Sequence, residues 1–352
     1  MRAITVVPGK AGSARLDDIG EPDRAEGAVL AQIIAMGVCG TDAEILRGEY
    51  GWPPPGRDRL VLGHESLARV IEAPADCGLS EGDHVVGIVR RPDPEPCPSC
   101  AVGEWDMCRN GRYTERGIKQ RNGYGAERVR IETEFAVPVD RALGICGVLL
   151  EPASVVAKAW DQVERVGHRT RAWAPRTALV TGAGPVGLLA ALLGVQRGLE
   201  VHVYDRVQTG LKPQLVRELG AKYHAPTLDS LDSFHPDIVI ECTGATPVVV
   251  DSLARTAALG IVCLAGVSSG GHKLPLDVGS INREMVLEND VVFGTVNANR
   301  RHYELGAEAL ARADRAWLEK LITRRVPLSR WQQAFEHRED DVKVVLEFAA
   351  SE

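Results

Sequence analysis

The stretch Thr177–Arg206, TALVTGAGPVGLLAALLGVQRGLEVHVYDR, decides the fold of this chain. Residues 177–181 form an apolar run typical of a buried strand, and residues 185–197 have the composition of a helix. A second apolar run at residues 201–204 again predicts a strand. The stretch therefore predicts a strand–helix–strand unit in which the two strands are parallel.

Three glycines in the pattern Gly182-x-Gly184-x-x-Gly187 lie between the first strand and the helix. The first permits a tight turn, the second lets a pyrophosphate approach the backbone, and the third lets helix and strand pack closely. The helix N-terminus offers free N–H groups to phosphates. The alternative is a glycine turn without a ligand. We expect a dinucleotide to bind the loop formed by Gly182, Ala183, Gly184, Pro185, Val186 and Gly187.

An acid is expected about 20 residues after this loop, and Asp205 stands there, at the end of the second strand. Its carboxylate can accept hydrogen bonds from both ribose hydroxyls and would repel a 2′-phosphate, which favours NAD over NADP. Arg206 keeps NADP open, because its guanidinium can pair with a 2′-phosphate or stack on adenine.

Two further apolar strands are predicted within PDIVIECTG, residues 236–244, and GIVCLAGV, residues 260–267. Strands that alternate with helices predict a doubly wound parallel sheet, the Rossmann arrangement, covered on both faces. Such sheets bind ligands at the carboxyl ends of their strands. The residues there, which are otherwise ordinary turn residues, are predicted to line the nicotinamide: Thr243, Gly266 and Val267.

The first 150 residues have a different sequence pattern. Short β-branched runs, such as residues 28–38 and 83–90, are separated by clusters of Gly, Pro and Asp, which predicts a small β-barrel with long loops. A strand-like run at residues 343–349 is expected to return to this domain. We therefore predict a barrel domain of residues 1–155 and 299–352 and a cofactor domain of residues 156–298.

The composition excludes several classes of function. A length of 352 residues suits two domains, and a net charge of −7 argues against binding to nucleic acid or an anionic membrane. The N-terminus lacks the apolar core of a signal peptide, and no apolar run approaches the roughly 18 residues of a membrane span. We expect a cytoplasmic protein with a small-molecule substrate.

Two short motifs carry possible metal ligands: Cys39 in GVCGTD, and the pair His64–Glu65 in VLGHES. Glu151 opens the helix predicted at the domain junction. Each residue alone would more often be structural. Together, a thiolate, an imidazole and one or two carboxylates suit a catalytic zinc that keeps a position for substrate.

These motifs, in this order, resemble the zinc-dependent medium-chain dehydrogenase/reductases over essentially the whole chain. That family combines a GroES-like β-barrel with a Rossmann domain. The resemblance implies that Cys39, His64 and Glu65 bind the catalytic zinc and that Glu151 is a fourth ligand or a close partner. It also implies a homodimer or homotetramer, assembled at the Rossmann sheet edge near residues 290–297.

The segments CGTDAEILRGEYG, RRPDP, YTERGI and FGTVNANRRHY are closest to the glucose dehydrogenase branch of that family. This resemblance implies that Glu115 and Asn297 contact the sugar hydroxyls or the nicotinamide end, beside Glu151. Glu44 stands where alcohol dehydrogenases carry a relay histidine. Three apolar residues stand where some glucose enzymes have polar sugar contacts: Val89, Val155 and Leu287.

The spacing Cys97-x2-Cys100-x7-Cys108 resembles the structural zinc lobe of the family with one ligand missing. Pro94 stands at the position of the missing cysteine. Either Asp93 or Glu95 supplies an oxygen as the fourth ligand, or the lobe is metal-free and held by packing.

The expected reaction is hydride transfer to NAD(P) from a sugar hydroxyl, at C1 of D-glucose or a related aldose, which gives the lactone. Thr41 touches the substrate and begins the proton relay, or it caps the helix that starts near Asp42. The alternatives are a polyol, inositol or amino-alcohol dehydrogenase with the same zinc chemistry, a non-catalytic NAD(H)-binding protein, and a zinc-free quinone reductase of the same fold.

Overall fold

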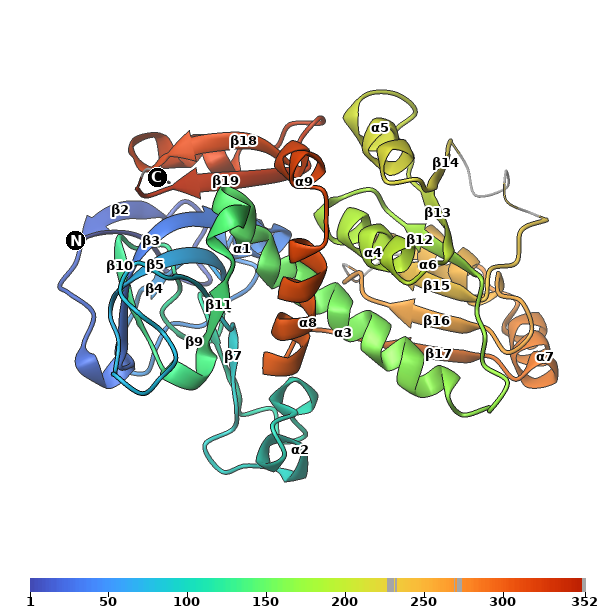
Figure 1. Ribbon diagram of the computed structural model, residues 1–352, viewed down its shortest axis with the longest axis horizontal. Coiled ribbons are helices and arrows are strands. Elements are labelled where there is room, and N and C mark those ends of the chain that lie inside the picture. The colour runs from blue at the N-terminus through green and yellow to red at the C-terminus, as the bar shows by residue number, and fades with distance from the viewer. Residues whose placement is uncertain (227–230, 232, 269, 271–273, 350–352) are drawn as a thin grey trace. The chain divides into compact units, whose positions relative to one another are not determined.

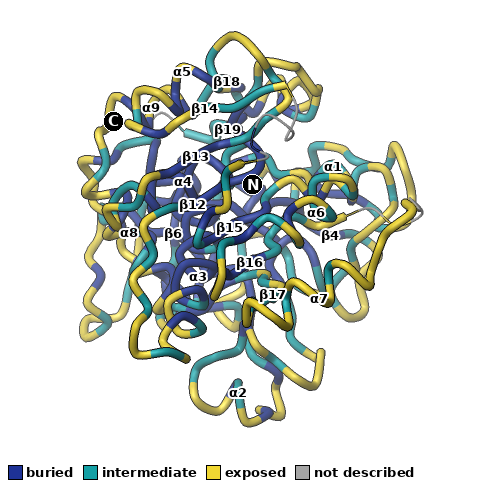
Figure 2. Tube along the Cα trace, turned by 90° about the vertical axis from the view of Figure 1, so that its right-hand side faces the viewer, coloured by how far each residue is buried: buried dark blue, intermediate teal, exposed yellow. Residues whose placement is uncertain are grey.

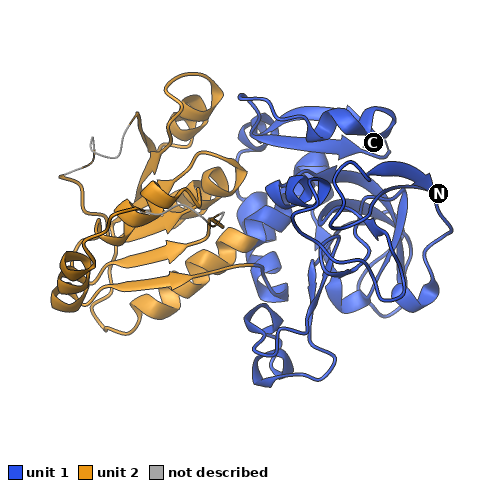
Figure 3. Ribbon diagram, turned by 180° about the vertical axis from the view of Figure 1, so that it is seen from behind, with its two compact units in different colours: residues 1–154, 297–352 blue, residues 155–296 orange. Residues whose placement is uncertain are grey.

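The computed structural model describes residues 1–226, 231, 233–268, 270 and 274–349 and divides the chain into two compact units (Figure 3). The first unit comprises Met1–Ser154 and Asn297–Glu352, and the second comprises Val155–Val296. The chain thus passes from one unit to the other at residues 154/155 and 296/297, where the sequence suggested 155/156 and 298/299.

The first unit consists mainly of short antiparallel strands. Its largest sheet has seven strands in the order β11-β6-β5-β3-β19-β18, with β10 also paired to β3. The strands of this sheet are β3 (Val29–Gly37), β5 (Glu65–Glu72), β6 (His84–Gly87), β10 (Arg128–Ile131), β11 (Ala136–Val139), β18 (Ile322–Pro327) and β19 (Lys343–Glu347).

Two three-stranded sheets complete the first unit, in the orders β2-β1-β4 and β7-β8-β9. Their strands are β1 (Arg2–Val6), β2 (Arg15–Asp18), β4 (Leu60–Val61), β7 (Arg90–Arg91), β8 (Thr114–Arg116) and β9 (Gln120–Arg121). A core of fully buried apolar side chains lies among these strands, including Ile4, Met36, Leu60 and Leu346.

Helices in the first unit are short. They are α1 (Gly40–Leu46), α2 (Pro98–Ala101), α8 (Arg300–Ala311) and α9 (Arg315–Leu321), with single 3₁₀ turns η1 (Arg24–Glu26), η2 (Trp105–Met107) and η3 (Thr133–Phe135) and the longer η4 (Arg141–Leu149) and η6 (Leu328–Phe335).

Strand pairing brings three distant segments of the first unit together. Gly37, at the end of β3, is the register partner of Glu65 on β5 and of Val345 on β19. The residues just after β3 therefore lie beside the start of β5 and the start of β19. This is how Cys39, His64 and Glu65 come to share one end of the sheet.

The second unit is the predicted doubly wound sheet (Figure 1). Its strands pair in parallel throughout, in the order β14-β13-β12-β15-β16-β17. The strands are β12 (Thr177–Thr181), β13 (Glu200–Tyr204), β14 (Lys222–His224), β15 (Ile238–Glu241), β16 (Ile261–Leu264) and β17 (Val291–Gly294). The helices are α4 (Pro185–Gln196), α5 (Leu211–Glu218), α6 (Thr246–Leu253) and α7 (Val278–Glu288), and α3 (Leu150–Gly167) begins in the first unit and continues in the second.

The inner strands of this sheet are buried on both faces, as Figure 2 shows for β12, β15 and β16. Helix α4 is apolar on every side, and all its residues from Gly187 to Gly194 are buried. A helix without a polar face is stable only inside a protein, so α4 anchors the glycine-rich turn that precedes it.

One long apolar segment lies at the junction of the sequence between the barrel strands and the glycine-rich turn. Arg141–Gly167, which joins η4 to α3 and is interrupted by a non-helical Gly144, is by length and composition alone apolar enough to cross a bilayer. Because 78% of its most apolar window is buried within the protein, it is a core helix of the fold.

Candidate active site

A glycine lies close before each of Cys39 and His64 in the sequence: Gly37 at the end of β3 and Gly63 directly before His64. A Cβ on Gly37 would lie 2.0 Å from Oε2 of Glu65, so only glycine lets the two strands pair this closely. Gly63 has a φ of +92°, and a Cβ there would lie 2.0 Å from the sulfur of Met36. The glycines that made the motifs recognisable are therefore required by packing at the site.

The predicted zinc ligands Cys39, His64 and Glu65 do converge. One donor atom from each residue, a sulfur, a ring nitrogen and a carboxylate oxygen, lies within 4.8 Å of the other two. In a tetrahedral zinc site, bonds of 2.0–2.3 Å place neighbouring ligand atoms about 3.3–3.8 Å apart. A small contraction would bring the three donors onto one ion, so the donor set fits zinc.

Asp42 supports this cluster and was missed in the sequence. It is fully buried, and its Oδ2 accepts a hydrogen bond of 2.9 Å from the Cys39 amide. Its Oδ1 lies 3.5 Å from His64 Nδ1, and both atoms lack a hydrogen-bond partner among the described residues. A carboxylate behind a histidine fixes which ring nitrogen faces a metal. The signal was available, because an acid three residues after a helix N-cap commonly bonds back to it.

Burial disfavours the charged form of His64, but the negative charge of Asp42 and the neighbouring Cys39 outweigh this and raise the pKa of the imidazole well above its usual value. The site thus attracts positive charge. A metal cation meets the same negative surroundings.

Lys343 on β19 is the second residue that the sequence analysis missed. Its Nζ lies 2.7 Å from each carboxylate oxygen of Glu65, and both side chains are 2% exposed. Glu65 is therefore shared between the metal cluster and a buried cation. A lone lysine inside the apolar run VKVVLEF was the available signal, since lysine is almost never fully buried unless it is paired.

Glu151 lies near the cluster but outside the group of three donors found among the described residues. It is 9% exposed. Burial raises the pKa of its carboxyl to about 7, with an opposing effect of His64 and a reinforcing one of Glu65. An acidic side chain buried beside the three donors agrees with the expected role of Glu151 as a fourth ligand or a close partner of the ligands.

Thr41 does not cap α1. The helix begins at Gly40 with Cys39 as its N-cap, so Thr41 lies within the first turn. It is partly exposed, and its hydroxyl makes no hydrogen bond to any residue that the structure describes. The helix-cap interpretation is therefore wrong, and the hydroxyl is available to a ligand.

Glu115 and Asn297, the predicted sugar contacts, are hydrogen-bonded to each other. Asn297 Nδ2 donates to Glu115 Oε1 at 2.8 Å, and Arg90 donates to the same oxygen from Nε and Nη2 at 3.1 and 3.0 Å. Asn297 adopts a left-handed conformation with φ +62°. Sequence reasoning missed Arg90, which fixes the carboxylate. Of the three apolar positions noted above, Val89 is buried in the core and Leu287 is 66% exposed on α7.

The glycine-rich turn has the geometry that its pattern predicts. Gly182 has φ +94°, and a Cβ on Gly187 would lie 1.8 Å from the carbonyl oxygen of Gly182. A Cβ on Gly184, by contrast, would meet nothing within 4 Å. The first and third glycines are thus required by the protein, and the second leaves open space where a pyrophosphate can approach.

Asp205 lies against this turn. Its Oδ2 accepts a 2.7 Å hydrogen bond from the Ala183 amide, and its Oδ1 accepts one from Val207. Arg206 is exposed and forms no hydrogen bond or ion pair with the residues described. The acid is thus positioned at the loop, and the arginine is free to turn toward a ligand.

The carboxyl ends of β15 and β16 are organised by Glu241, a fully buried acid that was not singled out in the sequence. Its carboxylate accepts hydrogen bonds from the Thr243 and Gly244 amides. A Cβ on Gly266 would lie 2.2 Å from the Gly244 nitrogen, so the two turns touch. Val267 is 82% exposed beside them.

The sulfurs of Cys97, Cys100 and Cys108 also lie within 4.8 Å of one another. Neither predicted oxygen ligand joins this group among the described residues. Asp93 is buried and accepts hydrogen bonds from the Glu95 amide and from Arg112, and Glu95 itself is exposed. Backbone N–H groups of Arg109 and Cys100 lower the pKa of Cys97 to about 6, so this thiol readily becomes a thiolate.

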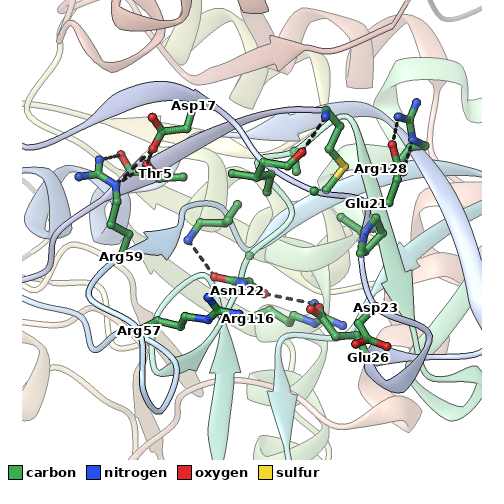
Figure 4. Close-up of a pocket in the computed structure, with 18 of the residues that line it drawn as sticks. Thr5, Asp17, Glu21, Asp23, Glu26, Arg57, Arg59, Arg116, Asn122 and Arg128 are labelled. Carbon is green, nitrogen blue, oxygen red and sulfur yellow. Dashed lines mark hydrogen bonds and ion pairs between the residues drawn. The ribbon is translucent and has the colours of Figure 1, made fainter.

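A cavity of about 690 Å³ lies elsewhere in the first unit, between β1 and β10 (Figure 4). Six of its charged side chains form ion pairs: Arg59 with Asp17, Arg128 with Glu21, and Arg116 with Glu26. None of the predicted site residues lines it. We assign no ligand to it.

Two family models match the chain: the alcohol dehydrogenase GroES-like domain over residues 25–141 and the glucose dehydrogenase C-terminus over residues 144–348. A glucose 1-dehydrogenase of Methanocella arvoryzae is 38% identical over 99% of this chain and 100% of its own length. One from Caldivirga maquilingensis is 40% identical over 99% of both.

Among solved structures, Haloferax mediterranei glucose dehydrogenase in complex with NADP, zinc and gluconolactone is 32% identical. It covers 99% of this chain and 100% of its own, with a TM-score of 0.90. An alcohol dehydrogenase of Thermotoga maritima, 23% identical with a TM-score of 0.81, shows the same fold. The converging ligands, the glycine-rich turn and these matches agree, and the chain belongs to the zinc-dependent medium-chain dehydrogenase/reductases, in their glucose dehydrogenase branch.

Proposed function

We propose that this protein oxidises the C1 hydroxyl of D-glucose, or of a related cyclic aldose, to the lactone and passes the hydride to NAD(P). The observation that carries the proposal is the convergence of Cys39, His64 and Glu65 within 4.8 Å. Relatives of similar length are named glucose 1-dehydrogenases, and the similar Haloferax mediterranei glucose dehydrogenase was solved in complex with NADP, zinc and gluconolactone.

Cys39, His64 and Glu65 hold the catalytic zinc, with Glu151 as a fourth ligand or close partner. Bound zinc would supply a Lewis acid that lowers the pKa of the substrate hydroxyl. Asp42 orients the ring of His64, and Lys343 restrains the carboxylate of Glu65.

Glu115 and Asn297 orient the sugar through its hydroxyl groups, in an arrangement already fixed by Arg90. The hydroxyl of Thr41 accepts the proton that leaves the C1 hydroxyl and passes it outward. Such relays need a side chain that is not committed to other bonds, which agrees with the unpaired state of Thr41 among the described residues.

The turn 182–187 holds the pyrophosphate, and Asp205 and Arg206 contact the adenosine ribose. Thr243, Gly266, Val267 and Asn297 hold the nicotinamide, which supplies the hydride acceptor. We propose a preference for NAD with retained use of NADP, because Asp205 repels a 2′-phosphate and the exposed Arg206 attracts one.

The remaining assignments are a structural zinc on Cys97, Cys100 and Cys108 with Asp93, a cytoplasmic location, and a homodimer or homotetramer. The clustered sulfurs and the readily formed Cys97 thiolate support the structural metal.

The test is reduction of NAD and of NADP by the purified, zinc-loaded protein with D-glucose, other aldoses, polyols and simple alcohols. We expect turnover of D-glucose with gluconolactone as product, and loss of turnover in Cys39→Ser. Turnover of a polyol or inositol without glucose would replace the substrate. A protein that binds zinc and NADH but oxidises nothing in the panel would contradict the enzymatic function.

A further inference from the structure

Two neighbouring aromatic side chains are unusually exposed in the first unit. Tyr50 is 39% and Trp52 46% exposed, and they are the only aromatic residues classed as exposed in the part of the chain that the structure describes. Leaving large apolar surfaces in water forgoes the free energy of burying them, so adjacent exposed rings commonly mark a surface that binds something.

The two rings are held in place. They pack edge to face with centroids 5.1 Å apart and planes at 74°. The backbone of Trp52 donates a 2.9 Å hydrogen bond to Ile118 and accepts one of 3.0 Å from Gln120, which fastens it to the turn between β8 and β9. A ligand that packs on these rings would therefore bind a surface that is already formed, at little cost in ordering.

The turn that fixes Trp52 directly follows β8, the strand that carries Glu115. Glu115 exchanges backbone hydrogen bonds with Lys119, the residue that bridges to Trp52. Burial raises the pKa of the Tyr50 hydroxyl, and the negative charge of Glu115 adds to this effect, which places Tyr50 within electrostatic range of the carboxylate. The exposed rings and the predicted sugar contact thus belong to one local surface.

One carboxylate oxygen of Glu115 can still accept a hydrogen bond at this surface. Its Oε1 receives Arg90 and Asn297, but its Oε2 receives no hydrogen bond from any described residue. The guanidinium of Arg90 in turn lies 3.7 Å from the ring centre of Tyr113, so the carboxylate is backed by a rigid stack. An open carboxylate oxygen beside exposed aromatic rings offers both a polar and an apolar contact.

We propose that Tyr50 and Trp52 form an aromatic wall on which the C–H face of a pyranose ring packs while Glu115 and Asn297 bind its hydroxyls. A pyranose has C–H groups on its faces and hydroxyls around its rim, which matches this division. The wall selects cyclic aldoses over linear polyols and small alcohols, which have no such face. This inference rests on the proposed sugar oxidation and names the residues that set its substrate class.

The experiment compares Tyr50→Ala, Trp52→Ala and Trp52→Phe with the wild type, and Ile71→Ala serves as a matched truncation of an exposed apolar side chain in the same unit. We expect each alanine variant to raise the KM for D-glucose about five- to tenfold with little change in kcat, and Trp52→Phe to recover most of the loss. Activity toward small alcohols should not change, nor should Ile71→Ala affect either parameter.

Tryptophan fluorescence gives a second measurement that does not depend on turnover. D-glucose added without cofactor should change the emission of the wild type but not of Trp52→Phe. If glucose is oxidised but KM and emission are the same in all variants, the aromatic wall is refuted and the proposed function stands. If glucose changes the Trp52 emission but is not oxidised, the proposed function fails and the wall stands.

If glucose gives neither signal, both ideas are wrong. A change of oligomeric state in Trp52→Ala, measured by size-exclusion chromatography with light scattering, would show that a second copy of the chain covers the rings, and would likewise overturn the proposal.

Discussion

At the scale of single residues, the candidate zinc site depends on side chains that do not themselves complete the donor set. Asp42 and Lys343 are both buried, and each contacts one of the three converging donors. Their contributions can be separated, because Asp42 acts on the orientation of His64 whereas Lys343 balances the charge of Glu65.

Asp42→Asn should lower the affinity for zinc about 10- to 100-fold, because the amide neither balances the charge of the site nor holds the ring of His64 in one orientation. Competition with a chromophoric chelator measures the affinity directly. Glu44→Gln, an exposed change on the same helix, is the control and should leave zinc binding unchanged. Equal affinities in Asp42→Asn and the wild type would remove Asp42 from the site.

Lys343→Met should lower the free energy of unfolding of the metal-free protein by about 3–5 kcal/mol, because Glu65 would be left buried without a cation. Chemical denaturation with and without zinc measures this. Lys343→Arg keeps the charge and should lose much less. Part of the loss in Lys343→Met should return on adding zinc, since the ion then neutralises the carboxylate; a loss that zinc cannot reduce would argue against this pairing.

The sequence predicted the site where the information was local. The motifs GVCGTD and VLGHES predict Cys39, His64 and Glu65 as ligands, because in each motif the candidate ligands are next to glycines in the sequence. Lys343 could not be assigned in this way, since it is 278 residues from its partner and only strand pairing brings the two together. The role of Arg90 could not be predicted for a similar reason: nothing in the local sequence RRPDP indicates a hydrogen bond to Glu115, which only the fold brings close.

At the scale of secondary-structure elements, the strands of the first unit are tied together by buried arginines around one acid. Glu132 follows β10 and receives hydrogen bonds from Arg91 on β7 and Arg121 on β9. Arg116 on β8 lies 3.8 Å away. Burial alone would raise the pKa of Glu132, but the three arginines outweigh it and hold the pKa below the usual value.

Because the pKa of Glu132 is lower in the folded than in the unfolded protein, its stabilising effect is present above the unfolded value of about 4.3 and is lost as the pH falls through the folded value. Glu132→Gln should cost about 3–5 kcal/mol near pH 7, where it leaves buried guanidinium groups unpaired. The difference in Tm from the wild type should shrink below about pH 4. Glu134→Gln, an exposed neighbour, is the control; a gap that stays constant with pH would contradict this account.

The strand–helix–strand unit was predictable at this scale because its hydrophobic pattern and its glycines agree. The predicted helix of residues 185–197 is α4, Pro185–Gln196. The first residue of α1 could not be predicted from the sequence. Its N-cap is Cys39, and cysteine is rare at this position, whereas threonine and aspartate, which follow at positions 41 and 42, are common there.

At the scale of the whole molecule, the second unit has a sheet edge with which no strand among the described residues pairs. β17 is the last strand in the order of its sheet, and α7 carries Val286 and Leu287, both 66% exposed. Unpaired edges and exposed apolar side chains of this kind are commonly covered by another chain. This supports assembly of the proposed dimer through that unit.

Leu287→Lys should therefore shift the protein toward monomers, because an ammonium group would be buried in the contact. Light scattering coupled to size-exclusion chromatography measures the mass. Val102→Lys, an exposed site in the first unit, should leave the mass unchanged. An unaltered mass in Leu287→Lys would place the contact elsewhere.

The pairing of Glu65 with Lys343 also has a consequence in time. A ribosome adds roughly 5–20 residues per second, so the 278 residues between them take roughly 15–55 seconds to synthesise. Nascent chains stalled before residue 343 should bind zinc less tightly than released chains, which zinc titration of ribosome-bound protein would reveal. Until β19 emerges, β3 lacks its neighbouring strand at Gly37, so the segments that carry Cys39 and Glu65 are not yet held together. Zinc binding at full affinity is then expected only late in synthesis, after the entire cofactor-binding unit has been made.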